Sequence, residues 1–290
     1  MAAEIIDGKR IAEVVKDNVR HEVEELKEKG INPGLAVVLV GEDPASKRYV
    51  SAKGKACKEV GIESIEHRLP ADTDIKDLLS LIDSLNKDVR VHGILVQLPL
   101  PKHLDQKTVI NSIAPEKDVD GLGPVSAGKL LLGEPAFLPC TPFGVMKMLE
   151  YYGIDPKGKY AVVIGRSILV GKPLALMLLS KNATVTMCHS QTKNLKEECL
   201  RADILCVVIG KARFITGDMI KEGAAVIDVG INVMPDGKLV GDVDFEAASK
   251  RAAYITPVPG GAGPMTIAML LDNTVRAAKR SAGIEVDAGL

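Results

Sequence analysis

Short aliphatic runs alternate with amphipathic helical patterns along almost the whole sequence, and this alternation limits the possible folds more than any other feature. Aliphatic residues dominate these runs, as is typical of strands buried on both faces of a sheet. Between the runs, apolar residues recur at three- and four-residue steps, as in 9–29, which ends at Gly30 and Pro33. The pattern predicts an α/β fold with parallel sheets and right-handed crossovers. The predicted strands are LAVVLV (35–40), HGILVQ (92–97), YAVVIG (160–165), TVTMC (184–188), DILCVVIG (203–210) and AAVIDVG (224–230).

The chain of 290 residues is long enough for two domains, each with its own core. Residues 116–142 are rich in Gly and Pro and show neither a strand nor a helix period, so we expect them to connect the domains. A second Gly/Pro cluster, at 256–266, precedes the last helical segment.

Composition argues against several classes of partner. The 37 basic and 38 acidic side chains nearly balance, which gives no electrostatic reason to expect nucleic acid or a membrane as the main partner. No apolar run approaches the roughly 18 residues that span a bilayer, and the N-terminus, MAAEIIDGKR, lacks the pattern of a signal peptide. The cysteines are odd in number and form no C-x-x-C pair, so we expect reduced thiols, no metal site and a cytoplasmic protein. They are Cys57, Cys140, Cys188, Cys199 and Cys206.

The segment KYAVVIGRSILVGKPLALML (159–178) resembles a dinucleotide-binding turn, but Ser167 stands where the second glycine of G-x-G-x-x-G is expected. Gly165 suits the tight turn and Gly171 suits close packing of helix on strand. The Ser167 hydroxyl offers a hydrogen bond to phosphate. By itself the pattern fits a Gly-containing turn without ligand equally well.

The next predicted strand distinguishes between the two nicotinamide cofactors. NAD sites usually place a carboxylate near its end to hold the ribose 2′-hydroxyl. Residues 184–194, TVTMCHSQTKN, contain none, and Arg166 can reach the same corner. Because a cation favours a 2′-phosphate, the sequence predicts NADP over NAD.

A second set of polar residues lies in the N-terminal half. Tyr49 and Lys53 are four residues apart in a predicted helix at 46–62 and therefore share a face. Gln97 ends a predicted strand, where polar side chains tend to line the ligand crevice. Asp120 follows in KDVDG. Spacing alone also allows a surface Tyr packed on a Lys stem, and Asp120 as a turn former.

Together these segments resemble the bifunctional methylenetetrahydrofolate dehydrogenase/methenyltetrahydrofolate cyclohydrolase family, in its bacterial form. The resemblance runs in order over nearly the whole chain, from IIDGK to the last helix. The segments that carry it are YVSAKGKACKEVGI, GILVQLPLP, PEKDVDG, PCTPFGV, VIGRSILVGKPLA, TVTMCHSQT, DVGIN and TPVPGGAGPMT.

The resemblance implies two domains with a folate cleft between them, and a homodimer. The folate-binding catalytic domain would comprise 1–139 and 265–290, because the family's C-terminal helix returns to it. Residues 140–264 would form a doubly wound, Rossmann-type NADP domain.

The resemblance also assigns roles to individual residues. Lys53 matches the catalytic lysine, and Gln97 matches the glutamine that is bonded to that lysine. Tyr49 matches the tyrosine that stacks near folate, and Asp120 matches the aspartate that holds the pterin. Two positions depart from the family pattern: Ala262 replaces a common valine, and Gln191 replaces a frequent lysine near the expected 2′-phosphate. The matched cofactor contacts are Gly165, Arg166, Ser167, Gly171, Ser190 and Ile231, and the loop that borders folate contains Pro259, Gly260 and Gly261.

The implied reactions are NADP-dependent oxidation of 5,10-methylenetetrahydrofolate to the methenyl compound and its hydrolysis to 10-formyltetrahydrofolate. The hydrolysis needs a group that is neutral near pH 7, so the pKa of Lys53 would have to fall by about 2–3 units from about 10.4. Three alternatives are a dehydrogenase without hydrolase activity, a non-catalytic NADP-binding scaffold, and a Rossmann oxidoreductase for a quinate-like substrate. The last does not account for the ordered motifs.

Overall fold

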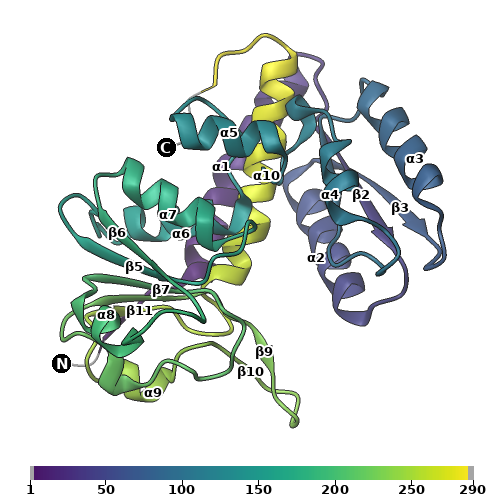
Figure 1. Cartoon of the computed structure of the whole chain (residues 1–290). Coiled ribbons are helices and arrows are strands. Elements are labelled where there is room, and N and C mark those ends of the chain that lie inside the picture. The colour runs from purple at the N-terminus through teal and green to yellow at the C-terminus, as the bar shows by residue number, and fades with distance from the viewer. Residues whose placement is uncertain (1–2, 287–290) are drawn as a thin grey trace. The chain divides into compact units, whose positions relative to one another are not determined.

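The computed structural model describes residues 3–286, which form two compact units, each built on a parallel sheet (Figure 1). The six-stranded unit comprises residues 3–13 and 139–266, and the three-stranded unit comprises residues 14–138 and 267–286. The chain passes from one unit to the other within α1 (Gly8–Glu28), just before α6 (Cys140–Tyr151) and within α10 (Ala262–Ser281).

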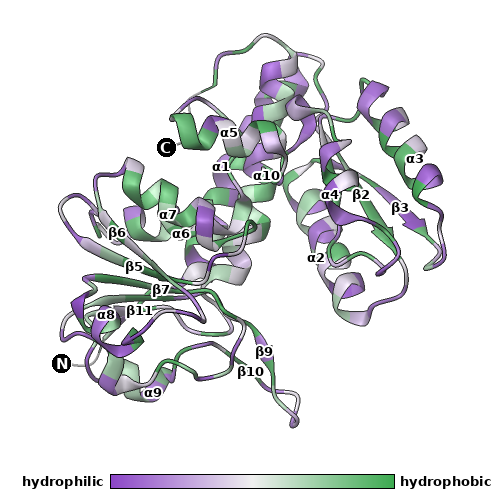
Figure 2. Cartoon of the chain, in the orientation of Figure 1, coloured by the Kyte–Doolittle hydropathy of each residue, from purple (hydrophilic) through white to green (hydrophobic). Residues whose placement is uncertain are grey.

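In the three-stranded unit, β2 (Gly34–Val40) lies between β3 (Glu63–Leu69) and β4 (Gly93–Val96). All of β2 and β4 is buried, whereas β3 alternates exposed with half-buried residues. Figure 2 shows the contrast, with β2 hydrophobic and β3 largely hydrophilic. The aliphatic runs predicted β2 and β4, but the polar sequence ESIEHRL concealed edge strand β3. The remaining elements are α2 (Pro44–Val60), α3 (Ile75–Lys87), α4 (Gln106–Asn111), η1 (Pro115–Lys117) and α5 (Pro124–Leu132).

Helix α2 has clear local signals at both ends. The Asp43 carboxylate accepts a hydrogen bond from the backbone N–H of Ser46 at 2.7 Å, and Pro44 occupies the first turn. Gly61 ends the helix in the left-handed conformation, with φ of 81°. These caps fix which residues α2 presents on each face.

The six-stranded sheet has the order β1-β11-β8-β7-β5-β6, with every neighbouring pair parallel. The order reverses between β5 and β7, because β5 is followed along the chain by β6 on its other side. In doubly wound sheets such a switch point, at the carboxyl ends of the strands, is the usual ligand crevice. The strands are β1 (Glu4–Ile5), β5 (Tyr160–Ile164), β6 (Thr184–Cys188), β7 (Ile204–Val207), β8 (Ala225–Asp228) and β11 (Tyr254–Ile255).

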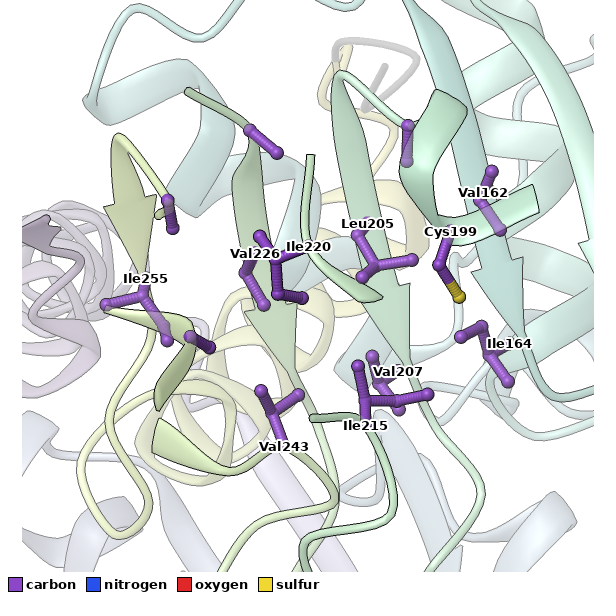
Figure 3. Packing of buried hydrophobic residues seen from close by; sticks show 14 of the residues in the cluster. Val162, Ile164, Cys199, Leu205, Val207, Ile215, Ile220, Val226, Val243 and Ile255 are labelled. Atoms are coloured by element: carbon purple, nitrogen blue, oxygen red, sulfur yellow. The ribbon is translucent and has the colours of Figure 1, made fainter. Parts of the chain in front are cut away.

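Helices cover both faces of this sheet (Figure 1). One face packs on a buried, mainly aliphatic cluster (Figure 3). Alternate residues of β5 and β7 contribute to it, together with Val226 of β8, Ile255 of β11, Cys199 and Ile220. The edge strand β6 is only half-buried, so the prediction that it is buried on both faces is wrong. The remaining elements of this unit are α7 (Gly171–Ser180), α8 (Leu195–Arg201), η2 (Gly217–Met219), β9 (Asn232–Val233), β10 (Leu239–Val240) and α9 (Phe245–Ala248).

The observed units differ from the expected domains at the N-terminus. Residues 3–13 were expected beside the catalytic helices, yet β1 pairs with β11 in the six-stranded sheet. The Tyr152 hydroxyl adds to this tie, since it donates to the Ile5 carbonyl and accepts from the Asp7 N–H, both at 2.9 Å. Because β11 is far from β1 in the sequence, the residues around β1 gave no indication of this pairing.

The connecting segment also differs from its expectation, because 116–142 contains α5 and the start of α6. Pro124 in the first turn and Gly133 after the last turn bound α5, but exposed Leu131 and Leu132 obscure its amphipathic period. Farther along, from Ile267 onward, α10 belongs to the three-stranded unit. There Asn273 donates to the carbonyls of Val119 and Leu138, at 2.8 and 3.0 Å.

All five cysteines are buried free thiols. Burial raises the pKa of Cys57, Cys199 and Cys206 to about 12, so these thiols stay protonated at neutral pH. Within residues 3–286, no helix has both the length and the apolar character needed to cross a membrane.

Candidate functional site

Helix α2 carries Tyr49 and Lys53 one turn apart, but the two side chains differ in burial. Lys53 is only 8% exposed, whereas Tyr49 is 43% exposed. A lysine is rarely buried to this extent without a specific hydrogen-bond partner. The environment of Lys53 is therefore not that of a solvated helix face, which was the alternative that spacing alone left open.

The structure brings Lys53 and Gln97 together. The Lys53 amine donates to the Gln97 amide oxygen at 2.9 Å, although the residues are far apart in sequence. The amide nitrogen of Gln97 donates to the Leu98 carbonyl at 2.7 Å, and its backbone N–H donates to Val38 on β2 at 2.8 Å. The amide is thus held with its oxygen toward the amine. A neutral amide oxygen can accept from the amine in either protonation state, as a proton-transferring group requires.

Asp120 lies half-buried in a turn that Asp118 organises. The Asp118 carboxylate accepts from the Gly123 N–H at 2.8 Å, the Ser126 hydroxyl at 2.7 Å and the Leu122 N–H at 3.2 Å. Burial raises the pKa of Asp118 to about 6, and the negative charge of Asp120 adds to the shift. Sequence reasoning singled out Asp120 and passed over Asp118, although both lie in the same KDVDG motif.

The Gly165 turn has the close approaches that a dinucleotide fingerprint needs. Gly165 has a φ of 129°, and a Cβ there would lie 2.6 Å from the Val208 carbonyl oxygen. At Gly171 a Cβ would lie 2.3 Å from the Gly165 carbonyl oxygen. Both glycines therefore let α7 begin directly against the turn, which brings the N-terminus of this helix to the switch point.

Ser167 takes the place of the missing glycine without obstructing this turn. Its hydroxyl oxygen accepts from the backbone N–H groups of Val170 and Gly171, at 3.1 and 3.3 Å. The hydroxyl hydrogen remains available to donate to a phosphate oxygen. The turn therefore fits a pyrophosphate. The Ser167 O–H would donate to it where the second glycine of the usual motif lets the backbone come close.

Arg166 and Ser190 are both exposed at the neighbouring strand end. The Gly165 N–H donates to the Cys188 carbonyl at 2.9 Å, which joins the turn to the end of β6. Arg166 makes no ion pair with any other residue in the described range 3–286. With no carboxylate in 184–194, this corner suits a 2′-phosphate better than a free 2′-hydroxyl.

The other predicted residues of the six-stranded unit lie on two loops. Ile231 follows β8 and is 45% exposed, and a Cβ at Gly263 would lie 3.7 Å from its Cδ1 atom. Exposed Pro259 and buried Gly260 and Gly261 precede α10. The Gly260 carbonyl accepts from the Lys9 N–H at 3.1 Å, so the start of α1 supports this loop.

Two buried carboxylates in this unit were not predicted as functional residues. Asp228 and Asp242 are 3% and 0% exposed. Burial raises the pKa of Asp228 to about 6, and the charge of Asp242 contributes. Asp228 is the first residue of the DVGIN motif, so its position was noted in the sequence. Its neighbours in the sequence do not indicate that its side chain is buried. Across residues 3–286 no three His, Cys, Asp or Glu side chains gather as metal ligands would.

One unit is a doubly wound sheet with a glycine-containing turn at its switch point, and the other holds a buried lysine–amide pair. These features are those of a dinucleotide-dependent α/β enzyme with a separate catalytic unit. Comparison with known protein families agrees with this description. Residues 6–120 match the tetrahydrofolate dehydrogenase/cyclohydrolase catalytic domain, and residues 139–282 match the NAD(P)-binding domain of the same family.

Similar proteins extend over the full length. The bifunctional protein FolD of Moorella thermoacetica is 64% identical over 97% of this chain and 100% of its own. The crystal structure of the Campylobacter jejuni FolD methylenetetrahydrofolate dehydrogenase/cyclohydrolase is 52% identical, with a TM-score of 0.95 over 97% of this chain and 100% of that one. The Trypanosoma brucei enzyme, solved with NADP cofactor and inhibitor, is 40% identical, with a TM-score of 0.93 over 97% and 99%. The chain belongs to the tetrahydrofolate dehydrogenase/cyclohydrolase family.

Proposed function

We propose that this protein oxidises 5,10-methylenetetrahydrofolate to 5,10-methenyltetrahydrofolate with NADP⁺ and then hydrolyses the product to 10-formyltetrahydrofolate. The observation that carries the proposal is the buried Lys53–Gln97 pair in the region that matches the family's catalytic domain. The relatives named as bifunctional are full-length matches, which supports both activities rather than one.

We place NADP on the six-stranded unit. The Gly165 turn would hold the pyrophosphate, with a hydrogen bond from the Ser167 hydroxyl and the positive end of the α7 dipole beside it. Arg166 and Ser190 would bind the 2′-phosphate, and Ile231 would pack against the cofactor. When bound, NADP⁺ supplies the hydride acceptor. The chain's task in that step is positioning, because loss of hydride leaves a delocalised cation and needs no strong base.

Lys53 is the group we assign to the hydrolysis. Its neutral amine would take a proton from the water that adds to the methenyl carbon, and its protonated form would return a proton as the ring opens. Gln97 would keep the amine oriented through both states. Tyr49 would stack near the folate and Asp120 would bind the pterin, with Pro259, Gly260 and Gly261 bordering the substrate.

The proposed domains follow from these assignments. The folate-binding catalytic domain would consist of the three-stranded unit, including α10 from Ile267, and the NADP domain would be the six-stranded unit with residues 3–13. We further propose a cytoplasmic homodimer without nucleic-acid or membrane partners. Five buried, free thiols support a reducing compartment. Light scattering of the purified protein should give twice the chain mass of 30.9 kDa.

One assay tests the proposed function. Purified protein is mixed with methylenetetrahydrofolate and NADP⁺, and the reduced cofactor, the methenyl compound and 10-formyltetrahydrofolate are followed by chromatography. We expect reduced cofactor and 10-formyltetrahydrofolate with only transient methenyl compound. Methenyl compound that persists at the rate of its uncatalysed hydrolysis would show a dehydrogenase alone. No reduced cofactor and no enzyme-dependent hydrolysis of added methenyltetrahydrofolate would show a non-catalytic scaffold.

A further inference from the structure

The two buried carboxylates of the six-stranded unit hold together loops that follow three different strands. Asp242 comes two residues after β10, and its carboxylate receives four N–H donors. One oxygen accepts from the backbone N–H groups of Ile209 and Gly210, at 2.7 and 2.9 Å. The other accepts from the Lys211 N–H at 2.8 Å and the Asn232 side-chain amide at 3.0 Å.

Asp228 makes the reciprocal contacts from the end of β8. One oxygen accepts from the N–H groups of Gly230 and Asp242, both at 3.0 Å, and the other accepts from the Val243 N–H at 2.8 Å. Asp228 thus holds the backbone at Asp242, and Asp242 in turn holds the side chain of Asn232, which follows Asp228 in the chain. We call this arrangement of Asp228, Asp242 and their donors the aspartate clasp.

Glycines make the clasp possible. A Cβ at Gly230 would lie 2.1 Å from the Asp242 carboxylate, and a Cβ at Gly241 would lie 1.8 Å from the Asp228 carboxylate. Any larger residue at either position would displace a charged group that is buried and fully engaged. Gly230 and Gly241 therefore leave the space that the two carboxylates occupy.

The clasped loops are those at the switch point. Val208 directly precedes the clasped loop 209–211, and its N–H donates to the Ile164 carbonyl at 2.9 Å. Its own carbonyl lies against Gly165, where a Cβ would be 2.6 Å away. On the other side, Gly230 and Asn232 flank Ile231. One carboxylate, that of Asp242, thus fixes both the loop that closes on the Gly165 turn and the segment that presents Ile231.

We infer that Asp242 is a positioning residue for the dinucleotide, acting through the clasp to set the spacing of the loops at 208–211 and 230–232. The inference rests on the proposed NADP site and goes beyond it, because Asp242 is fully buried and acts only through the loops. Loops held by backbone N–H groups to a buried carboxylate are ordered before the ligand arrives, which lowers the entropy cost of binding.

Asp242→Asn tests the inference, because the amide puts an NH₂ group where the carboxylate accepted N–H donors. We expect the dissociation constant for NADP⁺, measured by isothermal titration calorimetry, to rise at least about tenfold, which is about 1.4 kcal/mol. The KM for NADP⁺ should rise with it, while the KM for methylenetetrahydrofolate changes less than about twofold.

A milder variant and a control separate positioning from general destabilisation. Asn232→Ala removes a single donor from a half-buried side chain and should weaken NADP⁺ binding about threefold or more, even if Asp242→Asn fails to fold. Asp203→Asn is the matched control, since Asp203 accepts from the Tyr160 N–H at 2.8 Å at the amino ends of the strands. It should lower the melting temperature and leave NADP⁺ affinity unchanged.

The outcomes distinguish this inference from the function on which it rests. Wild-type NADP⁺ affinity in folded Asn232→Ala, or in folded Asp242→Asn, would overturn the inference alone. An equal loss of affinity in Asp203→Asn would also overturn it, because destabilisation would then explain the effect. A wild-type protein that binds no NADP⁺ would overturn both the cofactor proposal and the inference.

Discussion

At the scale of single residues, burial distinguishes side chains that could take part in chemistry from solvated surface side chains of the same residue type. Lys53 and Lys55 lie two residues apart on α2, yet Lys53 is 8% exposed and the side chain of Lys55 is 81% exposed. The same holds for the carboxylates of KDVDG, where Asp118 is buried and Asp120 is half-buried. The roles we propose follow these environments more closely than they follow residue type.

Arg166→Ala should weaken NADP⁺ more than NAD⁺, because only NADP carries the phosphate that the guanidinium would bind. We expect kcat/KM for NADP⁺ to fall about tenfold or more, while the value for NAD⁺ changes less than about twofold. Lys181→Ala removes an equal charge from the far, exposed end of α7 and serves as the control. Equal losses with both cofactors in Arg166→Ala would contradict the 2′-phosphate assignment.

At the scale of elements, the aliphatic runs predicted the interior strands, because a strand that is buried on both faces consists mostly of aliphatic residues. The helix predicted at 46–62 corresponds to α2 (Pro44–Val60), and its ends carry Pro44 and Gly61, whose conformational effects do not depend on the rest of the chain. By contrast, β3 and α5 were missed because each exposes much of its surface. The clasp carboxylates look like ordinary turn formers, since only tertiary packing buries them.

Gly171→Ala should displace the start of α7, because its Cβ would lie 2.3 Å from the Gly165 carbonyl oxygen. We expect weaker NADP⁺ binding by about tenfold or more and a lower melting temperature, measured by calorimetry. Gly128→Ala on α5, where a Cβ meets no atom within 4 Å, should instead stabilise the protein by about 0.5–1 kcal/mol. Unchanged affinity in Gly171→Ala would show that the close approach is not needed for binding.

At the scale of the whole molecule, two units carry the two halves of the family signature, and each contains one aspartate whose pKa burial raises to about 6. The N-terminal strand shows what sequence cannot supply at this scale. The pairing of β1 with β11 joins segments that are far apart in the chain, so residues 3–13 lie in the six-stranded unit, whereas the resemblance implied that they belong to the catalytic domain. The candidate site residues come mainly from the family resemblance, since spacing alone also allowed a purely structural role for each of them.

Stability should decline as pH rises from about 4 to about 7, because Asp118 and Asp228 are easier to protonate when folded than when unfolded. The stabilisation from each is complete below 3.8, the ordinary pKa of an aspartate in the unfolded chain, and is lost as pH rises through the folded pKa of about 6. From a shift of about two units, each contributes up to about 3 kcal/mol to this decline. Asp118→Asn should therefore flatten the plot of unfolding free energy against pH, measured by urea titration.

Asp105→Asn is the control for this measurement. Hydrogen bonds from Thr108 lower the pKa of Asp105, so its stabilising effect is present above the ordinary aspartate value of 3.8 and is lost as pH falls below it. Its substitution should alter the plot below about pH 4 and leave the slope between about 4 and 7 unchanged. An identical slope for wild type and Asp118→Asn would contradict the assignment of a raised pKa.

The role of Lys53 in hydrolysis is the central claim, and Lys53→Met tests it most directly, with Lys55→Met as the matched control on the same helix. Each variant is given methenyltetrahydrofolate, and its hydrolysis is measured after subtraction of the uncatalysed rate, with folding checked by circular dichroism. We predict that Lys53→Met slows hydrolysis at least about 100-fold while Lys55→Met stays within about twofold of wild type. Hydrolysis at the wild-type rate by folded Lys53→Met would contradict the account.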